Sequence, residues 1–243
     1  MKSGNYLPII NEIFCQNRSY KMLETQKQYV VDMAKKSSEW GLCKHKAGNS
    51  SVRDKETGYV LVTPTTIDKK LLTIRDIVVM DLDANVIEAD SGLRPTSECL
   101  MHLEIYKARP DIFAISHTHS IFATSFAVLA RPIPAIVYEC AILNLKDGVI
   151  PVAPYGRPGT PDLSNSVIGP IKRSDAILME KHGAIAVDKD PYEAVLKAAY
   201  IEEMAEIYYH SLLINGGKDP RGFSSEELQS WAYPSQIKFK NNF

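Results

Sequence analysis

Two histidines separated by a single residue constrain this chain more than any other feature of its sequence. His117 and His119 lie in the segment Phe113–Ser120, which is predicted to form a β-strand. Because strand side chains alternate between the two faces, both imidazoles would lie on one face, about 7 Å apart. This spacing would allow both rings to bind one metal ion.

The histidine pair also has a simpler interpretation, because histidines at alternate strand positions can be buried groups that hydrogen-bond to the backbone. Two further features favour a metal site. His182 follows a short apolar run and precedes Gly183, where the missing side chain would let another group approach closely. Glu98 adds a carboxylate, and three nitrogens with one carboxylate oxygen favour Zn²⁺ over Ca²⁺ or Mg²⁺.

Length and charge limit what the rest of the chain can do. With 243 residues, 45% of them hydrophobic, it is expected to form one domain. The 28 basic and 29 acidic residues give a formal charge of -1, which argues against a nucleic-acid or membrane-surface partner.

No apolar run approaches the roughly 20 residues of a membrane span, and no signal peptide is recognisable, so a cytoplasmic protein is expected. The separated cysteines, expected to be reduced, are Cys15, Cys43, Cys99 and Cys140.

Turn signals and apolar spacing predict alternating helices and strands. Residues 1–18, which mix Pro8 with polar residues, are expected to be an N-terminal extension, and 19–243 a single domain with a C-terminal segment from about 218. Helices are predicted over Tyr20–Trp40, Thr96–Arg109, Ser120–Ala130, Thr160–Lys172 and Asp190–Asn215. Extended segments are predicted over Tyr59–Val62, Ile77–Asp81, Phe113–His119, Ala135–Tyr138 and Val149–Val152.

Several short groups of hydroxyl, amide and glycine residues resemble anion sites. Gly48–Ser51, in the predicted polar loop, could hold a phosphate through backbone amides and side chains. Thr63–Thr66 and the pair Thr96 and Ser97 stand at strand ends or a helix start, where amides are free to bind an anion. Ordinary turns and helix caps explain the same residues. Glu98 could likewise be only a favourable charge at a helix start, and His102 is expected to be a packed core residue.

Taken in order, these segments closely resemble the class II sugar-phosphate aldolase and ribulose-phosphate 4-epimerase family, and the fuculose-phosphate aldolases within it match best. The similarity extends from about Met22 to Leu213. It rests on Gly48–Ser51, Thr63–Thr65, Pro95–Glu98, His102–Tyr106, Arg109–Asp111, His117–His119 and His182–Gly183.

The resemblance implies a three-layer α/β/α fold around a central, largely antiparallel sheet. It implies a homotetramer with active sites between subunits and one Zn²⁺ per subunit, held by Glu98, His117, His119 and His182. The phosphate of a small phosphorylated sugar would then be bound by Gly48, Asn49, Thr65, Thr66, Thr96 and Ser97.

The implied reaction is zinc-dependent, reversible aldol cleavage of a ketose 1-phosphate, in particular L-fuculose 1-phosphate to dihydroxyacetone phosphate and L-lactaldehyde. Glu98 would be both metal ligand and proton-transfer base, and Tyr138 would exchange a proton with the aldehyde oxygen. Tyr233 is a candidate for a C-terminal tyrosine that reaches a neighbouring subunit. The alternatives are 4-epimerisation of L-ribulose 5-phosphate, dehydration of a thiosugar phosphate and a noncatalytic scaffold of the same fold.

Two departures from the family pattern affect the expected phosphate site. Lys46 stands where the fuculose-phosphate aldolases often have threonine, and its ammonium could contact the phosphate directly. Thr66 replaces a glycine, and a β-branched residue tolerates a positive φ poorly, so this loop is expected to be reshaped.

Overall fold

The computed structural model describes residues 7–230, with side chains from residue 23 onward. The helices are α1 (Leu7–Glu39), α2 (Cys99–Ala108), α3 (Ile121–Val128), α4 (Pro161–Ile171), α5 (Pro191–Ile214) and α6 (Ser225–Gln229), with 3₁₀ helices η1 (Lys69–Leu71), η2 (Ile74–Asp76) and η3 (Tyr138–Leu143). The strands are β1 (Asn49–Arg53), β2 (Val60–Val62), β3 (Val78–Met80), β4 (Val86–Glu88), β5 (Ala114–Thr118), β6 (Ile133–Pro134), β7 (Val149–Ile150), β8 (Val152–Ala153), β9 (Ala176–Met179) and β10 (Gly183–Asp188).

The main sheet has eight strands in the order β4-β3-β2-β1-β5-β10-β9-β8, and β6 pairs with β7 in a small second sheet. Neighbours in the main sheet are antiparallel except β8 and β9, which are parallel. β5 lies between β1 and β10. Its residue His117 is paired with Asn49 on one side and with Ile185 on the other. The predicted strand with the histidine pair is therefore central to the sheet.

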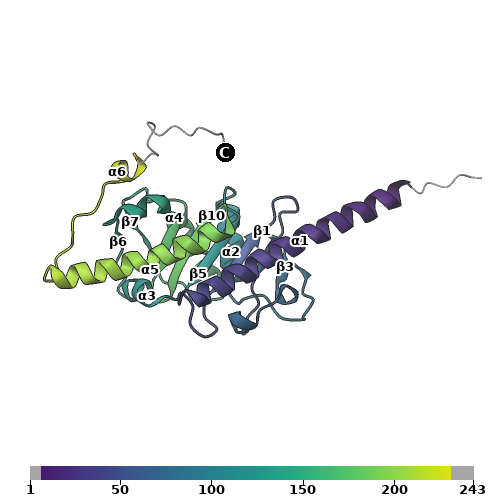
Figure 1. Cartoon of the computed structure of the whole chain (residues 1–243), viewed down its shortest axis with the longest axis horizontal. Coiled ribbons are helices and arrows are strands. Elements are labelled where there is room, and N and C mark those ends of the chain that lie inside the picture. The colour runs from purple at the N-terminus through teal and green to yellow at the C-terminus, as the bar shows by residue number, and fades with distance from the viewer. Residues whose placement is uncertain (1–6, 231–243) are drawn as a thin grey trace, which may run out of the picture.

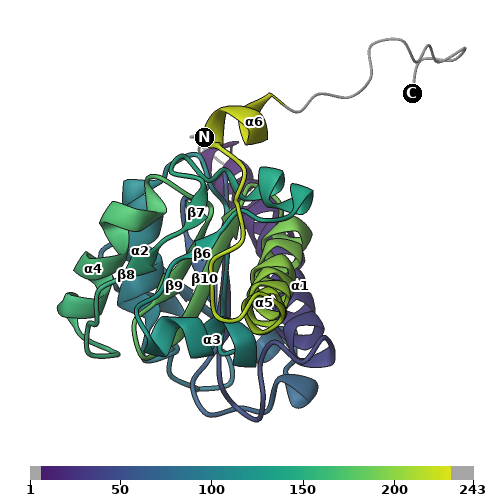
Figure 2. The same cartoon turned by 90° about the vertical axis from the view of Figure 1, so that its left-hand side faces the viewer.

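Helices cover both faces of this sheet. Figure 2 shows α1 and α5 on one side and α2 and α4 on the other. Successive strand residues separate accordingly: Leu61 packs in the cluster with α1, whereas its neighbours Val60 and Val62 pack in the cluster with α2 and α4. This period of two is what a sheet buried on both faces requires. The expected three-layer fold with a largely antiparallel sheet is confirmed.

The long helix α5 packs closely on the sheet, as its small residues predict. Ala194, Ala198 and Ala205 are fully buried, so the helix backbone can approach the strands. Its N-terminus is capped by Asp190, whose carboxylate accepts hydrogen bonds from two backbone amides of the first turn. In the described part of the chain, no helix is both long and apolar enough to cross a membrane. The cysteines with described side chains, Cys43, Cys99 and Cys140, are free thiols.

Three predicted boundaries are wrong. The first helix begins at Leu7 and not at Tyr20, because a proline in the first helical turn gives up no hydrogen bond. The predicted extension is thus helical from Leu7, and Figure 1 shows this end of α1 reaching beyond the other elements. The polar loop ends earlier than expected, since β1 begins at Asn49.

The third error concerns the predicted strand Ala135–Tyr138. Strand pairing ends at Pro134, and the chain then turns into the 3₁₀ helix η3, where the Cys140 amide bonds to the Val137 carbonyl at 3.2 Å. The run is apolar and β-branched, but its backbone groups find partners outside a ladder. The Ala135 carbonyl, for example, accepts a hydrogen bond from Phe223 at 2.7 Å.

A buried ion network connects the two helical layers through the sheet. Asp175, just before β9, accepts from Arg109 at 2.9 Å and from Lys197 of α5 at 2.9 Å. Lys197 also contacts Asp188, at the end of β10, at 2.6 Å. Lys197 is buried, so its ammonium is bound by these carboxylates in place of water. Removing one member of such a network leaves the others desolvated and unpaired.

We expect Lys197→Met to lower the free energy of unfolding by roughly 3 kcal/mol, the lower end of the range for breaking a buried ion pair. Arg109 would still neutralise Asp175, and Asp188 is partly exposed. Urea unfolding followed by circular dichroism measures the change. Lys35→Met, at an exposed position of α1, is the control and should change stability by less than about 0.5 kcal/mol. Equal effects of the two substitutions would contradict this account.

Candidate metal and substrate site

His117 is the most deeply placed member of the site. It lies on β5, almost fully buried, between β1 and β10. Its Nδ1 is 2.9 Å from the Ala184 carbonyl oxygen. Because a carbonyl can only accept, Nδ1 donates to it, and Nε2 is the ring nitrogen directed into the site.

The other two histidines come from the ends of neighbouring strands. His119 directly follows β5, and its backbone amide bonds to the Leu42 carbonyl at 3.2 Å. His182 lies in the turn between β9 and β10, where its amide bonds to Met179 at 3.0 Å. The three ring centroids are 4.7, 4.9 and 4.9 Å apart. The structure therefore brings the three predicted imidazoles into one cluster.

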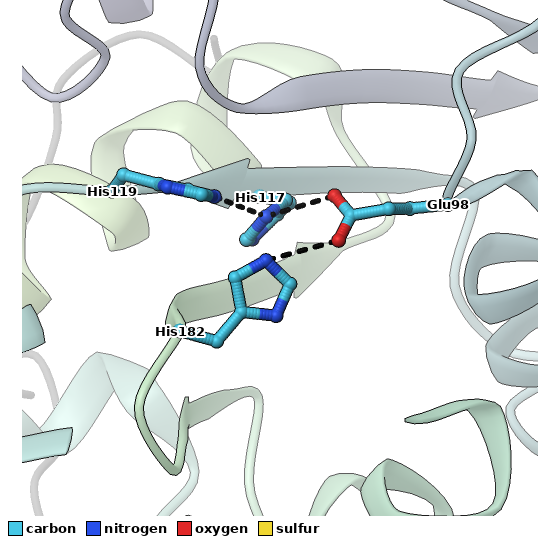
Figure 3. Close-up of side chains that lie close together, drawn as sticks. All are labelled: Glu98, His117, His119 and His182. Atoms are coloured by element: carbon cyan, nitrogen blue, oxygen red, sulfur yellow. Dashed lines mark hydrogen bonds and ion pairs between the residues drawn. The ribbon is translucent and has the colours of Figure 1, made fainter. Parts of the chain in front are cut away.

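Glu98 completes the cluster from the opposite side (Figure 3). It is the residue before α2, but its side chain makes no capping hydrogen bond. Instead its Oε2 lies 3.1 Å from His117 Nε2, and its Oε1 lies 2.9 Å from His182 Nε2. The interpretation of Glu98 as only a favourable charge at a helix start is thus wrong, because the carboxylate faces the histidines.

The four side chains fit a metal ion. One ligand atom from each of Glu98, His117, His119 and His182 can be chosen so that all lie within 4.8 Å of one another. His117 Nε2 lies 3.1 Å from Glu98 Oε2 and 2.9 Å from His119 Nε2, so atoms that can bind a cation converge in one small volume. Glu98 Oε1 is buried without a hydrogen bond from the described residues. A divalent cation would satisfy all of these groups.

The electrostatics of the site keep Glu98 and His119 in the forms that bind a metal. Burial alone would raise the pKa of Glu98, but His117 and His182 outweigh it and hold the pKa well below the usual range for a carboxyl group. Burial, followed by the neighbouring His117 and His182, lowers the pKa of His119 to about 3. At neutral pH the site therefore offers an ionised carboxylate and a neutral imidazole.

A pocket of about 350 Å³ opens beside the cluster. Glu98, His119 and His182 form part of its wall. The remaining lining residues include all six that were predicted to bind phosphate, Gly48, Asn49, Thr65, Thr66, Thr96 and Ser97, together with Lys46, Ala47, Pro64, Lys69 and Pro158. The predicted phosphate residues thus share one pocket with three of the four metal-ligand candidates; their role as phosphate ligands stays a prediction.

Backbone pairing holds the two threonine-containing loops of this pocket together. The Thr96 amide bonds to the Thr63 carbonyl at 3.0 Å, and an isolated bridge pairs Pro64 with Pro95. Thr66 has φ 64, so it adopts the left-handed conformation that a glycine would take without strain. A β-branched residue in this conformation is strained by an energy on the order of 1–3 kcal/mol.

Lys69 is a pocket residue that the sequence interpretation missed. Its side chain is only 3% exposed, and burial lowers its pKa. Its backbone carbonyl accepts from the Leu72 amide at 3.3 Å, but its ammonium has no ion pair or hydrogen bond among the residues that the structure describes. In the sequence, the adjacent Lys69 and Lys70 would be expected to lie on a solvated surface. The Asp68 side chain, however, caps η1 by accepting from the Lys70 amide, and Lys69 lines the pocket while Lys70 is exposed.

Tyr138 lies elsewhere on the chain's surface. It begins η3, is 49% exposed and lines a different pocket with Glu139, Ala141, Tyr200 and Leu228. The structure of the single chain therefore does not bring Tyr138 to the pocket of the metal-ligand candidates. Tyr233, the other predicted tyrosine, lies outside the described residues.

Gly183 has the close approach that its position after His182 predicted. A Cβ atom added there would overlap the Thr118 carbonyl oxygen and would lie 3.2 Å from His119 Cδ2 and 3.3 Å from His117 Cε1. The glycine therefore makes room for two of the candidate ligands. Gly48 is similarly restricted, because its φ is +71 and an added Cβ atom would overlap Cys43 Sγ.

Several characterised proteins are similar to this chain. Residues 28–209 match the model of the Class II Aldolase and Adducin N-terminal domain. L-fuculose phosphate aldolase from Escherichia coli O6:H1 is 35% identical over 198 residues, which is 82% of this chain and 87% of that enzyme. 5-Deoxy-D-ribulose 1-phosphate aldolase from Bacillus thuringiensis serovar kurstaki is 32% identical over 211 residues, 87% and 95% of the two chains. A solved L-fuculose 1-phosphate aldolase structure, 35% identical, superposes with a TM-score of 0.77 and covers 84% of this chain and 93% of its own.

We expect Gly183→Ala to weaken divalent-cation binding about 10–100-fold, the range found when groups that orient metal ligands are changed. The new methyl group must displace His117, His119 or the end of β5. Calorimetric titration of the metal-free protein with the cation measures the affinity. Gly169→Ala in α4 is the control, because an added Cβ there meets no atom within 4 Å. Unaltered affinity of a folded Gly183→Ala protein would contradict the role given to this glycine.

Proposed function

Because this chain belongs to the class II aldolase and adducin N-terminal domain family and is a lyase, we propose that it cleaves a ketose 1-phosphate by a reversible aldol reaction. The preferred substrate is L-fuculose 1-phosphate, and the products are dihydroxyacetone phosphate and L-lactaldehyde. One juxtaposition supports this most directly: Glu98, His119 and His182 line the same pocket as the predicted phosphate residues. A sugar phosphate anchored there would present its carbon chain to the metal-ligand candidates.

The proposed cofactor is one Zn²⁺ per subunit, held by Glu98, His117, His119 and His182. Three imidazole nitrogens and a carboxylate suit zinc better than the hard cations. When bound, the cation supplies Lewis-acid stabilisation of the negative charge that develops on the dihydroxyacetone half. The chain needs no Schiff-base lysine for this chemistry.

Glu98 is the proposed proton-transfer base for the dihydroxyacetone-side carbon. In the resting site its pKa is low because His117 and His182 lie against it, although burial acts in the opposite direction. If substrate loosens those two contacts, burial remains and the pKa of the carboxyl group rises. The same side chain can therefore be an ionised ligand at rest and a stronger base when substrate is present.

The proposed phosphate site combines backbone amides, hydroxyl groups and two lysines. Gly48 and Asn49 contribute their backbone, since the Asn49 carboxamide is already hydrogen-bonded to Glu98 at 2.7 Å. Thr65, Thr66, Thr96 and Ser97 supply hydroxyl groups from the paired loops. Lys46 and Lys69 add positive charge, and charge-assisted hydrogen bonds to phosphate are the strong ones.

Tyr138 can take its proposed part, exchanging a proton with the aldehyde oxygen, only if it comes from another copy of the chain. It is exposed and lines a separate pocket. A homotetramer with active sites between subunits would bring Tyr138 of one subunit to the pocket of the next. We therefore propose this assembly together with the role of Tyr138.

The relative from Bacillus thuringiensis favours 5-deoxy-D-ribulose 1-phosphate as a second candidate substrate. Both ketose 1-phosphates contain the same phosphorylated dihydroxyacetone half. They differ in the aldehyde that is released. The pocket residues described above would bind the half that both substrates share. Selection between the two substrates therefore depends on the residues that contact the aldehyde half.

A substrate panel tests the proposed reaction. We expect the zinc-loaded protein to release dihydroxyacetone phosphate from L-fuculose 1-phosphate, chelation to abolish the release and zinc to restore it. Glu98→Gln should reduce kcat by about 10²–10⁴-fold in protein shown to contain the metal. A coupled NADH assay measures the product. Only an isomeric pentulose phosphate from L-ribulose 5-phosphate would establish epimerisation instead, and no turnover of any panel member would favour a scaffold.

Lys69→Met tests the phosphate site. We expect KM for the ketose 1-phosphate to rise about 10–100-fold with little change in kcat, because a hydrogen bond to a charged group contributes roughly 1.5–3 kcal/mol. The thermal midpoint should rise at the same time, since a buried unpaired ammonium is removed. The neighbouring exposed Lys70→Met is the matched control. A KM that Lys69→Met leaves unchanged, or that Lys70→Met raises equally, would contradict the proposed role of Lys69 in phosphate binding.

A further inference from the structure

A chain of buried hydrogen bonds leads away from Glu98 into the layer between α2 and the sheet. Asn49 Nδ2 is 2.7 Å from Glu98 Oε2, and Asn49 Oδ1 is 2.5 Å from His102 Nε2. His102 Nδ1 is 2.7 Å from Ser51 Oγ, which is 2.9 Å from the Tyr106 hydroxyl. His102, Ser51 and Tyr106 do not line the substrate pocket. Their contacts therefore have no direct part in holding a substrate.

The chemistry of the Glu98 end determines the direction of the bonds from Glu98 to Ser51. The Glu98 carboxylate only accepts, so the Asn49 amide nitrogen must donate to it, and the Asn49 oxygen must face His102. That oxygen also only accepts, so His102 Nε2 carries a proton. Nδ1 of the neutral ring is then an acceptor, and Ser51 donates to it. Ser51 in turn can accept from Tyr106.

The environment of His102 agrees with a neutral ring. The side chain is fully buried, and burial, followed by the nearby His117, lowers its pKa to about 3. Burial also raises the pKa of Tyr106 above its usual range, so this hydroxyl keeps its proton as a donor. The three bonds that join Ser51, His102, Asn49 and Glu98 thus all donate towards Glu98, and each bond in such a series polarises the next.

The alternative orientation of Asn49 is disfavoured by its partner His102. With the carboxamide turned over, the amide oxygen would face the Glu98 carboxylate and the NH₂ group would face the Nε2–H of His102. Two acceptors would then meet at Glu98 and two donors at His102, at buried positions. His102 therefore selects the orientation in which Asn49 donates to Glu98.

We propose that His102 is a positioning residue: by orienting Asn49, it fixes the Glu98 carboxylate for cation binding and for proton transfer. The kinetic part of this inference rests on the proposed aldolase function. The cation-binding part does not, because it depends only on Glu98 being a ligand. Orienting groups of this kind typically change metal affinity or activity by about 10–100-fold.

Two substitutions at His102 provide the test. His102→Phe keeps a ring of similar size and removes both hydrogen bonds, whereas His102→Gln keeps a donor that can reach Asn49. We expect His102→Phe to weaken divalent-cation binding and lower kcat by about 10–100-fold each, with KM changed less than about threefold. His102→Gln should recover most of both losses. Calorimetric titration with Zn²⁺ and steady-state kinetics on the intact, metal-analysed protein give the two readouts.

Controls separate positioning from general damage to the core. Ile105→Val, at a fully buried position of α2, should lower the thermal midpoint without changing cation affinity. If His102→Phe does not fold, Ser51→Ala replaces it, since it removes the donor to Nδ1 and leaves the ring in place. It should weaken cation binding in the same direction.

Some results would overturn the inference. Wild-type cation affinity in folded His102→Phe, or in Ser51→Ala where that variant is needed, would do so. Equal losses in His102→Gln and His102→Phe would also do so, because the bond to Asn49 would then be irrelevant. The calorimetric result decides the inference even when the wild-type protein cleaves no ketose 1-phosphate, so failure of the proposed function is seen separately.

Discussion

The antiparallel pairing of β5 with both β1 and β10 is the constraint on which the site depends. This register places Asn49 beside His117 on one side and Ile185 on the other. It also places the turn of His182 next to the end of β5, where His119 lies. A slip of one residue in either pairing would turn His117 to the other face of the sheet. The clustering of the three histidines is thus a direct product of strand register.

The sequence predicted the parts of the site that have a local chemical signature. The alternation of His117 and His119, and the glycine after His182, each follow from a physical need that spacing reveals. The alternation of helices and strands was predicted for the same reason, since periodicity is local, whereas the layered fold was implied by the resemblance to the family. The order of the strands in the sheet was not, because pairing partners are distant in sequence.

Residues whose role comes from burial escaped prediction. Lys69 looks like one of two surface lysines, and only the η1 turn shows that it lines the pocket. His102 was expected to be packed, and it is, but both ring nitrogens are hydrogen-bonded. Such networks join positions far apart in the chain. The strand predicted over Ala135–Tyr138 was wrong for a related reason. A β-branched apolar run does not show where the hydrogen-bond partners of its backbone lie.

Thr66 shows when the energetic cost of a strained backbone in the pocket loop arises. The residue stays in a left-handed conformation although its own side chain opposes it, because the neighbouring pairing of Pro64 with Pro95 sets the path of the backbone. The unfavourable geometry is therefore adopted once, during folding. On the proposed function, a phosphate would meet a loop that is already shaped, and its affinity would not be reduced by the work of shaping it.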